Sequence, residues 1–175
     1  MRARVEHLDV ALGIGDATPR LSWQLPEGAT VQDAYELRAG AVATGRVASA
    51  DNVLVPWPWA PLTSRERLEV QVRVWTDLGD TPWSEPTAVE AGLLQPDDWT
   101  ATWVSPVEHG SAAPGFRPAY LLHGLAVLDK PVVSARLYVT AHGIYEAYLN
   151  GHRVGDLELT PGYTEYGKRL QVQTY

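Results

Sequence analysis

The sequence predicts an all-β protein built from β-sandwiches, and three observations indicate this class. Apolar and polar residues alternate with a period of two in several short segments, which is the pattern of half-buried strands. The 13 prolines and 15 glycines among 175 residues interrupt these segments at short intervals. No segment shows the longer period of an amphipathic helix. Many short strands joined by Gly/Pro turns are typical of sandwiches.

The first strands are predicted after an irregular lead over residues 4–19, which contains several turn residues. Leu21, Trp23 and Leu25 would share one face of the first strand. Residues 34–41 alternate in the same way and form the second strand, because a period of two places every other side chain on one face.

The most regular strand is predicted over residues 67–77, which read RLEVQVRVWTD. Leu68, Val70, Val72 and Val74 point to one side, and charged or polar residues stand between them. We expect the apolar side to lie in the core of the sandwich.

Shorter segments flank this strand. Residues 53–55 are a short strand, and residues 56–62 (PWPWAPL) are an edge or a stiff loop, because three prolines remove ladder donors. A final strand over 81–92 would carry Trp83 and Ser84. About seven such segments within roughly 90 residues predict a fibronectin type III-like or immunoglobulin-like sandwich.

The middle of the chain, residues 93–131, is predicted to link the two domains. Residues 110–115 are small and favour a flexible loop, and 120–128 would form the first strand of the second domain. Trp99 and Trp103 are expected to pack against both domains and to clamp the linker between them.

The second domain is expected to start with a meander over residues 135–155. Asn150-Gly151 between two alternating runs is a strong hairpin signal, since a type I′ turn needs positive φ at both central residues. A last strand would cover 170–175. Because nothing follows it, we expect the chain to be a fragment whose edge at 168–175 is disordered or pairs with another chain.

Composition excludes several function classes. The net charge of −7 and the lack of any basic run longer than Lys168-Arg169 disfavour nucleic acid or anionic lipid as a partner. The absence of cysteine excludes disulfides and thiolate metal sites. The N-terminal MRARVEHLDV lacks the apolar core of a signal peptide, and no apolar run approaches the ~20 residues of a membrane helix. We therefore expect a cytoplasmic protein without membrane contact.

No catalytic residue is assigned from the sequence, and no metal site. Among the carboxylates, Glu146, Asp156, Glu158 and Glu165 are interpreted as solvated strand-edge or turn residues. None of the five histidines stands at a metal-ligand spacing from another donor; they are His7, His109, His123, His142 and His152. Asp51-Asn52, Asp97-Asp98 and Asp156 could each offer oxygens to calcium, but no loop supplies the 6–8 ligands that this ion takes.

Sugar contact is considered at Trp57 and Trp59, which alternate with prolines on a segment expected to be exposed. A pyranose face stacks on an aromatic ring, so a rigid exposed tryptophan pair could bind sugar or could pack between domains. The other aromatic side chains singled out are interpreted as packing residues: Trp23, Trp83, Tyr163 and Tyr166.

The ordered motifs PRLSW, QVRVW, WSEP and GLLQPDDWTATWVSP, followed by YEAYLNG, RVGD, LTPGYTEY and RLQVQTY, resemble the N-terminal portion of bacterial α-L-rhamnosidases of the glycoside hydrolase family 78 type. The resemblance covers nearly the whole chain and is densest over 135–175. It implies a fibronectin-like domain at 1–92, a linker at 93–131 and the start of a jelly-roll, carbohydrate-binding-like domain at 132–175.

The resemblance also implies an enzyme that hydrolyses terminal rhamnose from glycosides by inversion, with both carboxylates on an (α/α)6 barrel. No position here matches that family's acidic motifs, so this chain should be catalytically inactive and should pack against the barrel of the same polypeptide. No cofactor is expected, although calcium is possible in the complete jelly roll.

Two alternatives stay open at this point. The chain could be a stand-alone carbohydrate-binding or adhesion module. It could also be the N-terminal part of another glycosidase, such as a β-galactosidase type, although there the jelly roll usually comes first.

Overall fold

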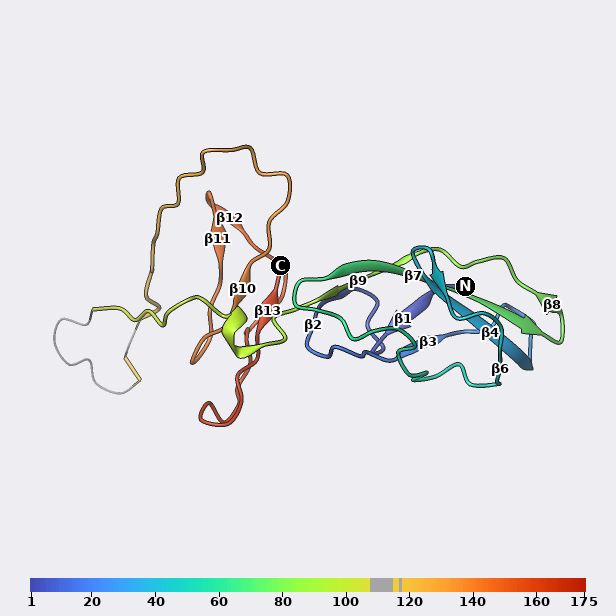
Figure 1. The fold of residues 1–175 in the computed structure, drawn as a ribbon. Helices are drawn as coiled ribbons and strands as arrows, with labels where there is room; N and C mark the ends of the chain where they lie inside the picture. The colour runs from blue at the N-terminus through green and yellow to red at the C-terminus, as the bar shows by residue number, and fades with distance from the viewer. Residues whose placement is uncertain (108–114, 117) are drawn as a thin grey trace.

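The computed structural model describes residues 1–107, 115–116 and 118–175, and within them it is all-β apart from one short 3-10 helix. Figure 1 shows β1 to β9 gathered in one body and β10 to β13 beside it. The predicted flexible loop at 110–115 lies mostly outside the described residues. The elements are β1 (Ala3–Val5), β2 (Ala11–Ile14), β3 (Leu21–Trp23), β4 (Gln32–Ala39), β5 (Val42–Ala43), β6 (Val47–Ala48), β7 (Arg67–Thr76), β8 (Gly79–Asp80), β9 (Thr87–Ala91), η1 (Pro96–Asp98), β10 (Tyr138–Val139), β11 (Tyr148–Leu149), β12 (His152–Arg153) and β13 (Gln173–Thr174).

The first body is a sandwich whose larger sheet has the order β2-β9-β7-β4-β5, with β6 and β8 pairing at its edges. All pairs are antiparallel except β2 with β9. The opposite layer is the β1–β3 pair, which is extended by a bridge between Leu21 and Val55. Thr87 on β9 donates a buried 2.9 Å hydrogen bond to the carbonyl of Ala3 on β1, which ties the two layers together.

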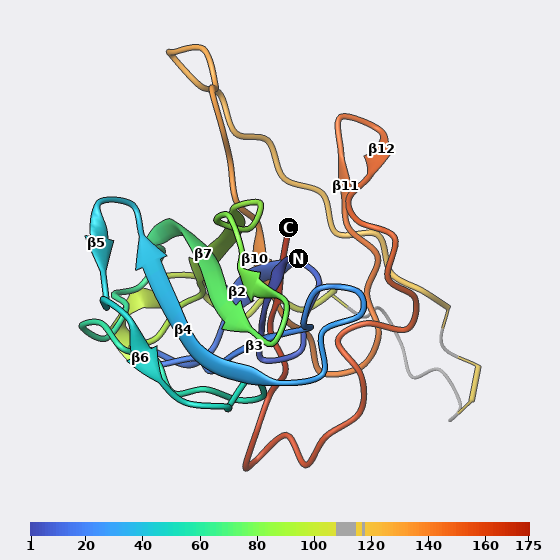
Figure 2. The same cartoon turned by 90° about the vertical axis from the view of Figure 1, so that its right-hand side faces the viewer.

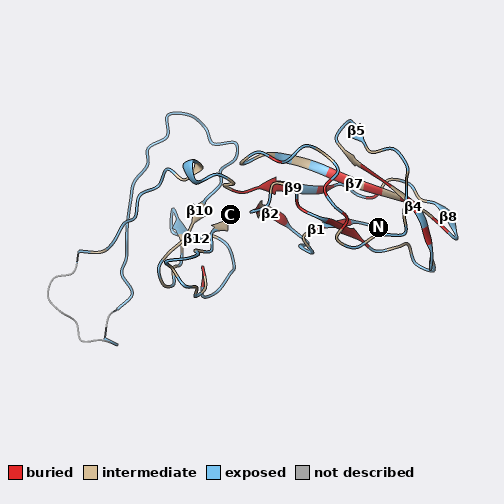
Figure 3. Ribbon diagram, turned by 60° about the horizontal axis from the view of Figure 1, so that its bottom comes forward, coloured by how far each residue is buried: buried red, intermediate tan, exposed pale blue. Residues whose placement is uncertain are grey.

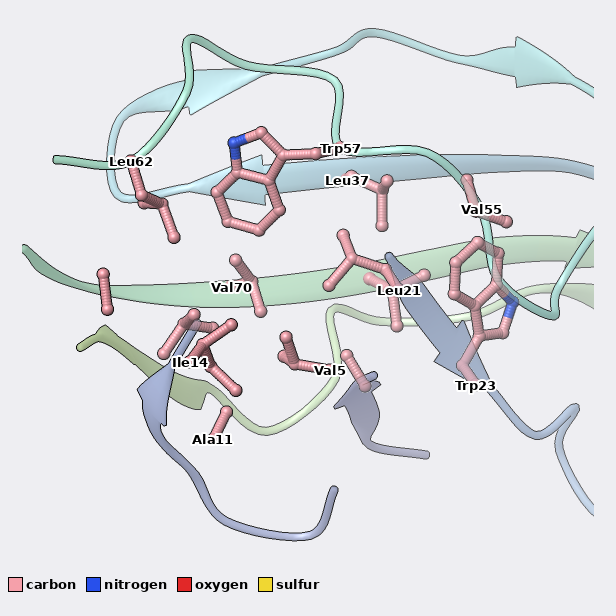
Figure 4. Packing of buried hydrophobic residues seen from close by; sticks show 14 of the residues in the cluster. Val5, Ala11, Ile14, Leu21, Trp23, Leu37, Val55, Trp57, Leu62 and Val70 are labelled. Carbon is pink, nitrogen blue, oxygen red and sulfur yellow. The ribbon is translucent and has the colours of Figure 1, made fainter. Parts of the chain in front are cut away.

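The predicted strand over 67–77 is confirmed as β7, and its inward face is the centre of the core. Val70, Val72 and Val74 are all 0% exposed. Leu21 and Leu37 pack against them from the two layers (Figure 4). Burying each of these side chains contributes about 1.5–3 kcal/mol, so this row dominates the stability of the domain.

The outward face of the same sheet carries alternating guanidinium groups and indole rings. Arg38 lies 4.3 Å and Arg73 4.8 Å from the ring centre of Trp83. Arg73 and Arg46 lie 5.1 and 4.9 Å from Trp75. Cation–π contacts of this kind let long polar side chains cover the indole rings, so the outer face needs no further apolar layer.

Predictions about three segments of the first body are wrong. Residues 53–55 form no strand, and only Val55 makes an isolated bridge, to Leu21. The expected irregular lead over 4–19 contains β1 and β2, which are too short to show alternation and are held by pairing with distant strands. Trp83 and Ser84 precede β9 instead of lying in it. They still run beside β7, because the Ser84 amide donates to the carbonyl of Val72 at 2.8 Å, while Pro82 and Pro86 prevent a continuous ladder.

The hairpin at Asn150-Gly151 is confirmed. Both residues have positive φ, 50° and 82°, and the turn joins β11 to β12 with Leu149 opposite His152. The wider meander is wrong, since β10 pairs with β13 and not with the run that ends in β11. The expectation of disorder or intermolecular pairing at 168–175 is also wrong. Leu137 and Tyr175 exchange two backbone hydrogen bonds of 3.0 Å within the chain.

The predicted strand over 120–128 is absent; these residues are extended without a ladder and mostly exposed. Leu121 is 92% and Leu125 is 86% exposed. An alternating pattern makes a strand only where another strand forms a ladder with it, and no strand of the described part pairs with residues 121–128. Figure 2 shows this segment as a long loop that extends away from the labelled strands, and Figure 3 colours the chain next to the grey trace pale blue, as exposed.

Replacing Leu37 by alanine should lower the free energy of unfolding by about 2–5 kcal/mol, because it leaves a cavity against the β7 valines. Leu37 is 1% exposed, whereas Val42 on β5 is 61% exposed. Val42→Ala is therefore the matched control, and it should change stability by no more than about 0.5 kcal/mol in urea titrations. Equal effects of the two changes would contradict the assigned core.

Candidate functional site

The two tryptophans considered for sugar contact lie against the core of the first body. Trp57 is only 8% exposed, so the expected exposure of this residue is wrong. Its indole nitrogen donates to the carbonyl of Ala60 at 3.0 Å. Trp59 packs on it edge to face, with ring centres 4.9 Å apart (Figure 4 shows Trp57 above Val70). This geometry favours packing, and sugar contact at Trp57 and Trp59 stays a prediction.

The carboxylates of the second half form surface ion pairs. Arg153 contacts Glu158 at 2.7 Å and Glu146 at 3.9 Å. The hydroxyl of Tyr148 donates to Glu146 at 2.8 Å. The hydrogen bond from Arg153 lowers the pKa of Glu158. A carboxyl whose anion is stabilised in this way is a poor general acid, and Asp156 and Glu165 are likewise exposed.

His142, which the sequence indicated only as a histidine without a metal-ligand spacing, belongs to an aromatic stack. Its ring lies between Trp103, at 4.4 Å, and Tyr166, at 4.7 Å. Trp103 thus joins the 93–131 segment to the second half, as expected, although it is 61% exposed. Tyr163 is 89% exposed, so its expected packing role is wrong.

Within the described residues, no group of three or more histidine, cysteine, aspartate or glutamate side chains is placed to hold a metal ion. His109 lies outside those residues. No helix of the described part has the length and apolar character needed to cross a bilayer.

The contact between the two halves is the feature that the sequence did not reveal. Arg136 forms a forked ion pair with Glu90 on β9, at 2.6 and 2.8 Å. Its hydrogen bonds hold the pKa of Glu90 below the ordinary value of 4.5, although burial acts in the opposite direction. Thr174 on β13 meets Gly13 on β2 so closely that a Cβ at residue 13 would collide with it.

Two open hollows lie near this contact. The first is lined by residues 62–65, Leu94, Gln95 and Asp98, and its polar groups already bond to one another: Ser64 with Asp98, and the Leu94 amide with Ser64 at 2.9 Å. The second, which we call the arginine crevice, has a volume of about 420 Å³. It is lined by Arg65, Arg67, Glu90, Ser134, Arg136 and Tyr138.

Trp57→Ala should lower the free energy of unfolding by about 3–5 kcal/mol, because it empties a buried site of the core. The exposed Trp103 is the matched control, and Trp103→Ala should cost about 1 kcal/mol or less, the value of an aromatic contact at the surface. Urea titration measures both. An unchanged midpoint for Trp57→Ala would show that its ring does not support the core.

Glu90→Gln should release residues 137–175 from the first body, because the amide cannot replace the forked ion pair. A lowered pKa means that the pair stabilises fully above about pH 4.5 and loses this stabilisation as the pH falls through the lower folded value. NMR relaxation should give one correlation time for both halves at pH 7 and a shorter one for 137–175 in the variant or at low pH.

The control is Glu36→Gln. Glu36 is 7% exposed and bonds Arg73 at 2.6 Å inside the first body, so its loss should destabilise that body without separating the halves. Equal tumbling of the two halves in Glu90→Gln would contradict the assigned role.

Comparison with known proteins identifies the relatives of this chain. The family described as "Rha78A-like, N-terminal immunoglobulin domain" matches residues 1–95, and "Alpha-L-rhamnosidase N-terminal domain" matches 130–175. Curated α-L-rhamnosidases of Formosa agariphila and an Alteromonas species are 33% and 32% identical over 94% of the chain. The chain spans only 20% of the length of each.

Solved structures of α-L-rhamnosidases are also similar to this chain. The α-L-rhamnosidase of Aspergillus terreus matches all of this chain and 21% of its own, with 39% identity and a TM-score of 0.74. That of Dictyoglumus thermophilum also matches all of this chain and 23% of its own, with 25% identity and a TM-score of 0.83. The chain therefore belongs to the α-L-rhamnosidase family and comprises an N-terminal immunoglobulin-like domain followed by sequence of the rhamnosidase N-terminal domain.

Proposed function

We propose that this chain is the non-catalytic N-terminal part of an α-L-rhamnosidase, which removes terminal α-L-rhamnose from glycosides with inversion at a barrel outside these residues. The observation that carries the proposal is the match to enzymes of that name along 94% of the chain and one fifth of their length. The substrates of the whole enzyme would be rhamnose-containing glycosides.

The arrangement of Glu146 and Glu158 supports a non-catalytic role. An inverting pair needs one carboxyl group with a raised pKa and a second carboxylate about 6.5–9.5 Å away, with water between them. The pair Glu146 and Glu158 instead shares Arg153 at an exposed hairpin, where the pKa of Glu158 is lowered. A carboxyl group with a lowered pKa is a poor proton donor, so Glu158 cannot protonate a leaving group efficiently.

The proposal divides the chain into an immunoglobulin-like domain at 1–92, a linker at 93–131 and a jelly-roll part at 132–175. The two family matches, at 1–95 and 130–175, support these boundaries. The exposed apolar side chains of the linker would pack against the catalytic barrel of the same polypeptide. A cytoplasmic location is part of the proposal, and cell fractionation with antibodies against the chain tests it.

The 175-residue chain should release no p-nitrophenol from p-nitrophenyl α-L-rhamnoside above the buffer rate. The polypeptide extended through its following domains should do so, because the catalytic carboxylates are proposed to lie there. Proton NMR of the fresh product should show β-rhamnose first, since inversion reverses the anomeric configuration.

Turnover by the 175 residues alone would refute the non-catalytic role. An extended polypeptide that cleaves β-galactosides and not rhamnosides would refute the substrate assignment. An α-configured first product would refute inversion while leaving the substrate assignment intact.

A further inference from the structure

The arginine crevice lies where β9 and the start of β7 meet the segment before β10. It is an open hollow with a volume of about 420 Å³. Three guanidinium groups face one carboxylate there, whereas the whole chain carries a net charge of −7. The wall of the crevice is therefore locally positive on a chain that is negative as a whole, and it should attract anions.

The three arginine side chains differ in how many of their donors already form hydrogen bonds within the chain. Arg136 uses its three nitrogens on the carboxylate of Glu90 and on the carbonyl of Ala135. Arg67 is exposed, and although its backbone pairs with Glu90 of β9, its guanidinium forms no hydrogen bond or ion pair within the described part of the chain. It nevertheless lies near enough to contribute to the lowered pKa of Glu90. Its fork of donors therefore lies at the crevice and is open to a ligand.

The remaining wall supplies further groups that can bind a ligand. Arg65 donates one hydrogen bond to the carbonyl of Asp98 at 3.0 Å, and its guanidinium lies 5.8 Å from the ring centre of Tyr138. The Tyr138 hydroxyl is buried without a hydrogen-bond partner among the described residues. Ser134 adds an exposed hydroxyl. Because the tyrosine oxygen is covered, Tyr138 contributes its ring to the wall of the crevice and no donor to a ligand.

We propose that the arginine crevice binds the carboxylate of an acidic sugar, with Arg67 as the main anchor and Arg65 and Ser134 as neighbouring donors. The sugar class rests on the function proposed above. A uronate fits because a planar carboxylate takes two parallel bonds from one guanidinium, while the ring hydroxyls need the mixed donors beside it. The site would let the N-terminal part recognise acidic units next to the rhamnose that the enzyme removes.

Isothermal titration of the 175-residue chain at low salt tests the proposal, with sodium D-glucuronate, D-glucose and sodium sulfate as probes. Glucuronate should bind about tenfold more tightly than either of the others, since only it offers both the carboxylate and the hydroxyls. Its affinity should fall with added salt, because the contact is ionic.

Arg67→Ala should weaken glucuronate binding about fivefold or more, and Arg67→Lys should restore part of it through charge without the fork. Arg169→Ala, an exposed arginine of the second half, is the control and should bind like the wild type. Thermal melts verify that all variants are folded.

Glucose or sulfate binding as tightly as glucuronate, or Arg67→Ala binding unchanged, would overturn the crevice as an acidic-sugar site. None of these results depends on rhamnoside turnover, so a failure here is separate from a failure of the proposed enzyme function.

Discussion

The pairing of β7 with β4 is the interaction on which the structure depends. The two strands stay in register from Ala39 opposite Val70 to Gln32 opposite Thr76, with one irregularity near Gln32. Because side chains alternate across a strand, this single ladder directs the β7 valines into the core and Arg73 to the outer face. The inner row excludes water, and the outer row covers tryptophan rings with guanidinium groups.

The other edge of β7 connects the first body to the second half through β9. β9 pairs with Arg67–Val70 and thereby fixes Glu90 opposite Arg67. Arg136 then binds Glu90 from outside the first body. The second half contains two-residue ladders and little buried apolar surface, so its position depends on contacts of this kind more than on a core of its own. The arginine crevice follows from the same arrangement, since it forms where the two halves meet.

How much of this could be predicted from the sequence depends on the range of each signal. β7 and the Asn150-Gly151 hairpin were predictable, because alternation and turn chemistry are local. β1 and β2 were not, and neither was the pairing of β10 with β13, since strands of two to four residues are fixed by distant partners. The candidate site was not predictable for the same reason, because its residues come from distant parts of the chain.

Trp57 stood between prolines and suggested an exposed platform, yet its loop lies across the sandwich and buries the ring. The prolines make that loop stiff, but they do not determine which way the indole points. The arginine crevice combines residues 65–67, 90 and 134–138, and no spacing along the chain brings them together. Only the pairing of β9 with β7 and the ion pair of Arg136 do so.

Native-state hydrogen exchange along the 175 residues tests most directly that a β7-centred sandwich supports the rest of the chain. Backbone amides of β4 and β7 should exchange slowest, at the rate of global unfolding. The paired amides of Leu137 and Tyr175 should be intermediate, and those of 120–128 should exchange fastest. Slower exchange in β10 and β13 than in β7, or equal protection of both halves, would contradict this account.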